Sequence, residues 1–314
     1  MQFPTRARLE IDVPPLLPGI SGLVQAIANS ATVQGAEVDL DEWICASSAP
    51  FATYAFDQAL NLYHDGKRAS AEAEWFTSYG VFEGIGYFTG WHAKDFNHLS
   101  IDDLWKVVQF EIVSGRPLVS IGFGGEGVVQ VVGFEASASA YRVDVTDGVN
   151  EWQFDVLNSR PQHDSETFVN FVVGVRAGDV GLMSKERQIA AVLRWGAEHL
   201  HALKEFVHET RENYAPGLAG AEVMLRLAQD GVEPQIFKRH VASRRRSREA
   251  AARVLPRWAE LIGEPALVQV GAEYEKIAQT LGPDPHAYEA ALHHERVAAQ
   301  LLASVASRLP SAFG

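Results

Sequence analysis

The spacing of hydrophobic residues along the chain changes near residue 180. Before that point, short runs rich in valine, isoleucine and aromatic residues alternate with glycine, proline and aspartate, a pattern that predicts strands and turns. The predicted strands cover residues 6–13, 116–123, 128–134, 141–148 and 168–175. Helical stretches are predicted between them at 20–29, 50–63 and 100–115. The last of these has Ser100 as N-cap and ends at Gly115, two residues before Pro117.

From Ser184 onward the hydrophobic residues follow a helical period. Alanine, leucine, glutamate and arginine dominate this half, and each predicted helix ends near glycine or proline. The predicted helices cover residues 184–209, 219–231, 240–263, 265–282 and 284–309. The two patterns together predict an α+β domain at 1–180 followed by an all-helical domain at 181–314.

Composition narrows the function. The chain has 314 residues, 47% of them hydrophobic, which is enough to bury a core. Its formal net charge of −13 argues against a nucleic-acid partner or an anionic membrane surface. There is one cysteine, and no apolar run reaches the length that crosses a bilayer. We therefore expect a cytoplasmic protein without a membrane span, and alanine-rich helices that would suit a homodimer interface.

A literal G-x-G-x-x-G at Gly122, Gly124 and Gly127 raises the question of a dinucleotide site. That fingerprint requires a helix after the glycine turn, because the helix N-terminus binds the pyrophosphate. Here the turn is followed by the valine-rich run 128–134, which favours a strand. The motif therefore predicts the tip of a β-hairpin, and no cofactor is expected.

Cys45 is the candidate nucleophile. It stands in the segment DEWICASSAPFATYAFD, just before the helix predicted to begin near Pro50. A cysteine ahead of a helix N-terminus has a lowered thiol pKa, which makes a reactive thiolate. The alternative is a small, buried apolar side chain, the commoner role of a free cysteine.

The order of these segments resembles the butirosin-biosynthesis H-type proteins, relatives of leader-peptide-cleaving cysteine peptidases. The resemblance rests on the cysteine-bearing segment, the block from Gly115 to Glu135, the strand ending in VDVTDG, and the helical tail NYAPGLAGAEVMLRLAQD with the segment 244–282. It implies a papain-like N-terminal domain, an acyl-transfer or peptidase ancestry, and a Cys, His and Asp that carry the chemistry.

The chain lacks a histidine at the position of the family's catalytic base. The family's histidine would fall near Gly127, where Glu126 and Val128 flank the glycine. Asp147 matches the acid, while Cys45, Ser47 or Ser48 could hold the nucleophile position. A triad without its base keeps little activity.

Other histidines and charged residues offer weaker alternatives. His64, His92 and His98 lie in the same half, the last two in a predicted loop. His201, Glu205 and His208 share a face of the predicted helix 184–209, a possible metal site that a solvated polar face explains better. The arginines in 244–248 would spread around their helix and form a mostly solvated, salt-bridging surface.

The leading hypothesis is thus a non-catalytic or degenerate papain-like protein that binds a small-molecule or acyl-type ligand in the old active-site cleft. Its cleft would be formed by Ser47, Ser48, Gly124, Glu126 and Gly127, beside the catalytic relics Cys45 and Asp147. One alternative is a working cysteine acyltransferase or amide hydrolase that uses Cys45. Another is a scaffold whose helical domain binds a protein partner.

Overall fold

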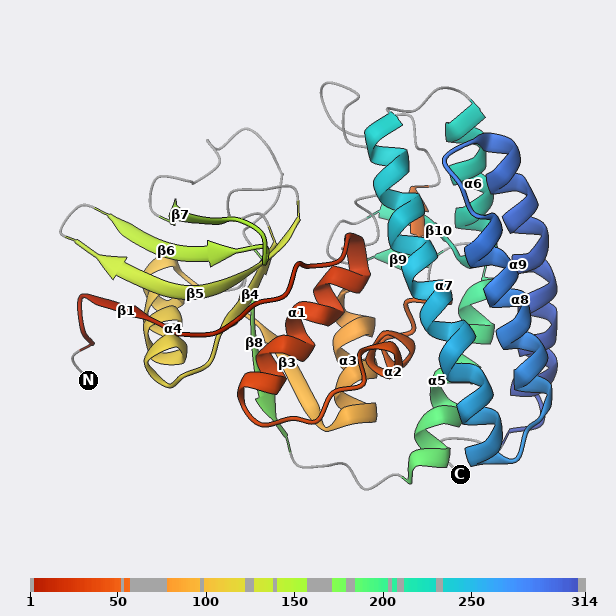
Figure 1. Ribbon diagram of the computed structural model, residues 1–314, viewed down its shortest axis with the longest axis horizontal. Helices are drawn as coiled ribbons and strands as arrows, with labels where there is room; N and C mark the ends of the chain where they lie inside the picture. The colour runs from red at the N-terminus through yellow and green to blue at the C-terminus, as the bar shows by residue number, and fades with distance from the viewer. Residues whose placement is uncertain are drawn as a thin grey trace. The chain divides into compact units, whose positions relative to one another are not determined.

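The computed structural model describes eleven stretches of the chain: residues 3–51, 54–56, 78–96, 99–121, 127–137, 140–156, 171–178, 184–202, 205–207, 212–229 and 234–309. These residues form a mixture of helices and antiparallel sheet, as the sequence predicts (Figure 1). The chain divides into two compact units. The first comprises 1–18, 22–38 and 90–180, and the second comprises 19–21, 39–89 and 181–314. One of the boundaries between the units falls between residues 180 and 181, and the Cys45 segment belongs to the second unit.

The first unit is an α+β unit built on a seven-stranded sheet. Its helices are α1 (Gly19–Val33) and α4 (Ile101–Val113). Its strands are β1 (Arg6–Arg8), β3 (Trp91–Asp95), β4 (Leu118–Ile121), β5 (Val128–Ala136), β6 (Tyr141–Thr146), β7 (Glu151–Asp155) and β8 (Phe171–Ala177). The strand order is β3-β8-β4-β5-β6-β7, all neighbours being antiparallel, and β1 pairs with the second half of β5.

The two faces of this sheet are covered by different helices. Alternation along β5 sends Val129 and Val131 into a core with Trp105 and Val108 of α4. Gln130 points the other way, where its side-chain amide donates to the Ala26 carbonyl and the Ser30 hydroxyl of α1. The pairing of β4 with β5 confirms the predicted hairpin, and a strand rather than a helix follows the glycine turn.

The second unit is mainly helical. Its helices are α2 (Leu40–Ala46), α3 (Ser78–Thr89), α5 (Lys185–His201), α6 (Gly217–Gln229), α7 (Pro234–Ile262), α8 (Ala266–Thr280) and α9 (Pro285–Ala306). A small sheet joins β2 (Tyr54–Phe56), β9 (Glu205–Val207) and β10 (Glu212–Pro216). The long helices α7, α8 and α9 lie side by side, which confirms the predicted helical half (Figure 1). Within the described ranges, no helix has the length and apolar character needed to cross a bilayer.

Two predicted helices are wrong in part. The stretch 50–63 was expected to be a helix, but Tyr54–Phe56 within it forms strand β2. The residues of this stretch beyond Phe56 lie outside the described part. The helix expected at 184–209 ends at His201, and Glu205 belongs to β9. In both stretches, pairing with β10 overrides the local helical pattern, since strand pairing depends on residues distant in sequence.

Candidate functional site

Cys45 lies inside helix α2, not ahead of a helix. Asp39 caps the N-terminus of α2, and its side chain accepts a hydrogen bond from the Glu42 N–H, so Cys45 falls in the last turn. The expectation that a helix dipole activates this thiol is therefore wrong, because the C-terminal end of a helix disfavours negative charge.

The thiol environment also opposes ionisation. Cys45 is fully buried, with 0% of its surface exposed. Burial raises the pKa of the thiol well above its ordinary value, and the negative charge of Asp41 raises it further, while Arg257 lowers it only in part. Cys45 is a free cysteine, and the charged groups that act most on its thiol are Asp41, Arg257 and Glu42. The arrangement is that of a structural cysteine.

Ser47 and Ser48 end helix α2. The Ser47 hydroxyl donates to the Ile44 carbonyl at 2.7 Å and accepts from the Ala49 N–H. Ser48 has a φ of +62°, the left-handed conformation that commonly follows a helix end. Both residues are buried. Helix termination explains the geometry of both residues.

Neighbouring helices pack tightly around this helix end. A side chain at Gly84 of α3 would place its Cβ 2.4 Å from the Ala46 carbonyl oxygen. One at Gly196 of α5 would meet the ring of Phe51 at 2.5 Å. Phe51 in turn contacts Tyr274 edge to face. Glycine at these positions lets the helices approach closely, so protein atoms fill the space beside Cys45.

Ion pairs fasten the N-terminus of α2 to α7. Asp41 accepts hydrogen bonds from Arg253, at 2.6 and 3.0 Å, and from Arg246 at 2.7 Å. Asp39 pairs with Arg257 at 2.6 Å. Burial raises the pKa of Asp41, but the hydrogen bonds and charges of Arg253 and Arg246 outweigh it and hold that pKa below its usual range.

We expect Asp41→Asn to lower the free energy of unfolding by about 1–2 kcal/mol at pH 7. Because the folded-state pKa of Asp41 is depressed, its contribution is complete above the unfolded value of about 3.9 and is lost as pH falls through the folded value. Urea unfolding between pH 7 and pH 3 should show the gap between wild type and variant closing at low pH. Glu260→Gln, an exposed carboxylate change on α7, is the control. A gap that stays constant with pH would contradict the assignment.

Asp147, the candidate orienting acid, forms a turn between β6 and β7. Its carboxylate accepts from the N–H groups of Val149 and Asn150, at 2.8 and 2.6 Å, and from the Asn150 side chain. Burial raises the pKa of Asp147, but these hydrogen bonds outweigh it and keep that pKa below its usual range. Asp147 belongs to the α+β unit and Cys45 to the helical unit.

At the hairpin tip, Gly127 is half-buried and has open space where a Cβ would stand. Gly124 and Glu126 lie outside the described residues.

The structure describes only some of the histidines that were considered as alternative bases or metal ligands. His92 lies on strand β3, where it pairs in register with Arg176, so the predicted loop is wrong. His64, His98 and His208 lie outside the described residues. The proposed His201–Glu205–His208 face does not exist, because Glu205 is in β9. Among the described residues, no group of three His, Cys, Asp or Glu side chains has metal-binding geometry.

The arginines predicted to be solvated are partly buried. Arg244 and Arg248 of α7 expose only 2% and 1% of their side chains, and both donate to Glu295 of α9. Arg244 also donates to the hydroxyl of Tyr288, which lies 3.2 Å from a ring nitrogen of His240. Salt bridging was predicted correctly, whereas solvation was wrong. Arginines can be buried on a helix when a carboxylate on a neighbouring helix accepts their hydrogen bonds and balances their charge.

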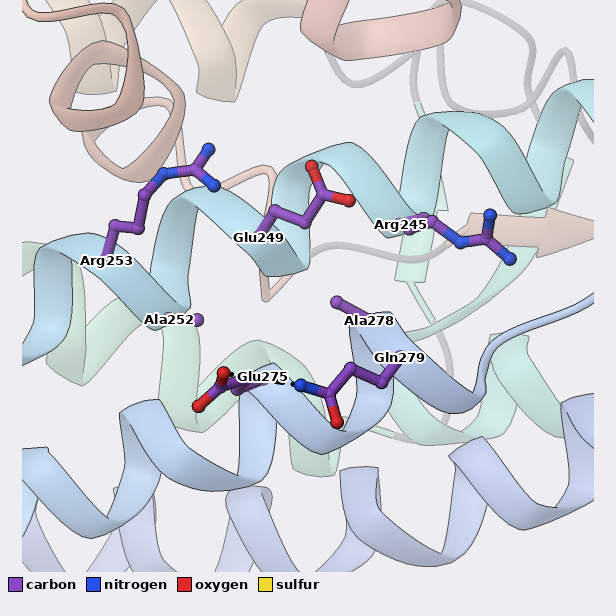
Figure 2. Close-up of a pocket in the computed structure, with 7 residues that line it drawn as sticks. All are labelled: Arg245, Glu249, Ala252, Arg253, Glu275, Ala278 and Gln279. Atoms are coloured by element: carbon purple, nitrogen blue, oxygen red, sulfur yellow. Dashed lines mark hydrogen bonds between the residues drawn. The ribbon is translucent and has the colours of Figure 1, made fainter.

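An open groove among the described residues of the helical unit lies between α7 and α8 and has a volume of about 620 Å³. Figure 2 shows Ala252 and Ala278 facing its centre, with longer polar side chains around them. Those side chains are Arg245, Glu249, Arg253, Glu275 and Gln279. None of the predicted site residues lines this groove. In the sequence, this groove corresponds to two alanines among charged residues on predicted helices. That pattern is too common to indicate a binding site.

Positively and negatively charged side chains lie close together along the groove. On α7, Glu249 lies between Arg245 and Arg253, one helical turn from each (Figure 2). Arg245 donates to the Leu281 carbonyl, and Arg253 is held by Asp41. On α8, Glu275 accepts from Gln279 at 3.3 Å. Such a surface can bind a polar small molecule against a short apolar floor.

No model of a known protein family matches the chain, and no curated protein matches it.

Proposed function

We propose that the protein is a non-catalytic member of the papain-like, butirosin-biosynthesis H-type group, which binds a small-molecule or acyl-type ligand without transferring it. The observation that supports this is the state of Cys45. Its thiol is fully buried in the last turn of α2, and burial raises its pKa. A nucleophilic cysteine requires access to substrate and a lowered pKa.

The α7–α8 groove is the binding place that the described residues favour. Its volume of about 620 Å³ is within the range of small-molecule sites, roughly 300–1,000 Å³. The carboxylate of Glu249 would accept from a cationic group of the ligand, and Arg245 and Arg253 would donate to an anionic one. Roles for Ser47, Ser48, Gly124, Glu126 and Gly127 in ligand binding stay predictions.

Alkylation of the native protein by iodoacetamide tests the proposal. The chain has one cysteine, so the reaction reports on Cys45 alone. We expect the native rate to be at least about a thousandfold below that of the urea-unfolded chain, because the thiol reacts only when the helical unit opens. Mass spectrometry of samples quenched between pH 6 and pH 9 gives the rate. The unfolded chain, with a midpoint near the free-thiol value of about 8.5, is the control.

A fast native reaction with a midpoint below that of the unfolded chain would overturn the proposal. It would favour the cysteine acyltransferase or amide hydrolase, in which Cys45 is the nucleophile. Cys45→Ala separates the two functions further. The variant should fold and keep ligand binding if the protein is non-catalytic, whereas an acyltransferase would lose turnover entirely.

A further inference from the structure

The C-terminal half of α4 exposes an aromatic ring that two guanidinium groups contact. Phe110 and Val113 are 38% and 50% exposed. The guanidinium carbons of Arg116 and Arg176 lie 5.3 and 5.8 Å from the centre of the Phe110 ring. Such cation–aromatic contacts orient the guanidinium groups while leaving their edges available for other bonds. This surface combines apolar area with directed donors.

A buried carboxylate fixes both arginines. Glu111, with 2% of its side chain exposed, accepts from Arg116 Nε at 2.5 Å and from Arg176 through its other oxygen. One negative charge thus faces two positive charges. In the described part of the chain, the remaining N–H groups of these two guanidinium groups have no other acceptor. They are held in position and able to donate.

Strand β3 extends the positive surface. His92 and Lys94 pair in register with Arg176 and Gly174 of β8 and are exposed. Cross-strand neighbours project from the same face of a sheet. The imidazole of His92 occupies the space beside Gly178, two residues beyond Arg176, which places it on that face. The acidic Asp95 falls on the opposite face by alternation.

We propose that this surface, the Phe110 patch (Lys94, Phe110, Val113, Arg116 and Arg176), docks an acidic segment of a partner protein. The fixed charges of the patch and Glu111 sum to +2, in a chain whose formal net charge is −13. Exposed basic groups around an apolar centre complement a segment that carries carboxylates beside an apolar side chain. The patch lies in the α+β unit, so the inference is independent of Cys45 and of the α7–α8 groove.

Fluorescence anisotropy with two labelled nonapeptides tests the inference. The acidic probe has four glutamates on each side of a leucine, and the basic probe has lysine in place of glutamate. The overall charge of the protein favours the basic probe, so preferential binding of the acidic one requires a local positive site. We expect the acidic probe to bind at 50 mM NaCl and to weaken at 200 mM.

Substitutions locate the site. Arg176→Gln should weaken binding of the acidic probe about tenfold, and Lys94→Glu should weaken it by a similar factor without touching Glu111. Arg187→Gln, an exposed arginine on α5, is the matched control and should leave the affinity unchanged. If Arg176 only stabilises the fold, its variant unfolds at a lower temperature and binds the probe as wild type does. That result would overturn the inference. So would equal effects of Lys94→Glu and the control, and so would failure of the wild type to bind the acidic probe.

Discussion

Glu295→Gln is expected to lower the free energy of unfolding of the helical unit by about 3–5 kcal/mol. Glu295 is buried and accepts from Arg244 at 2.5 Å and from Arg248 at 3.0 Å, two guanidinium groups that are themselves buried. The amide keeps the size of the side chain but removes its negative charge. Both positive charges then remain in a medium that screens them poorly, which is costly.

Urea unfolding followed by circular dichroism measures this change, since helices dominate the signal of the unit. Glu289→Gln, an exposed carboxylate change on the same helix, is the control and should alter the free energy of unfolding by no more than about 0.5 kcal/mol. Equal stability of the two variants would show that Glu295 is not the counter-charge on which α7 and α9 depend.

Gly148→Ala is expected to destabilise the α+β unit by about 3–4 kcal/mol, as the sum of two effects. Gly148 has a φ of +84°. Alanine is strained in this left-handed conformation even where no other atom is close to its Cβ. Its Cβ would also stand 2.2 Å from the Pro14 carbonyl oxygen and 2.6 Å from the Pro15 nitrogen. Backbone atoms cannot move aside as a flexible side chain can, so the turn that contains Asp147 must shift.

Two further glycines of the same unit separate these effects. Gly35 has a φ of +94° but nothing within 4 Å of its Cβ position, so Gly35→Ala should cost only the conformational part, about 1–2 kcal/mol. Gly127 has open space and no positive φ, and its alanine variant should be near neutral. Scanning calorimetry should rank the melting temperatures Gly127→Ala, Gly35→Ala, Gly148→Ala from highest to lowest. A variant at Gly148 no less stable than that at Gly35 would show that the backbone contact carries no cost.

Local pattern predicted most of the architecture. The valine-rich runs on either side of the glycines became β4 and β5, and Ser100 caps α4 through the Asp103 N–H, as its position predicts. The helices from 184 onward formed where alanine and leucine recur at helical spacing. These features depend on propensities and capping within a few residues, which a sequence displays directly.

The site could not be predicted in the same way. Cys45 precedes small polar residues that are typical of a helix entry, yet they form a helix exit, because Asp39 caps α2 six residues earlier. Tyr54–Phe56 lies in a stretch whose sequence pattern predicts a helix but becomes a strand by pairing with β10, more than 150 residues away. Arg244 and Arg248 look solvated until α9 places Glu295 against them.

The sequence by itself determined the two kinds of structure, their change near residue 180, the hairpin and the long helices, because hydrophobic period and end signals are local. Only the tertiary structure decided the burial of Cys45, the exposure of Phe110 beside two arginines, and the groove between α7 and α8. Exposure and pKa depend on which distant segments pack together, and a thiol, a guanidinium or a carboxylate acquires its chemistry from those neighbours.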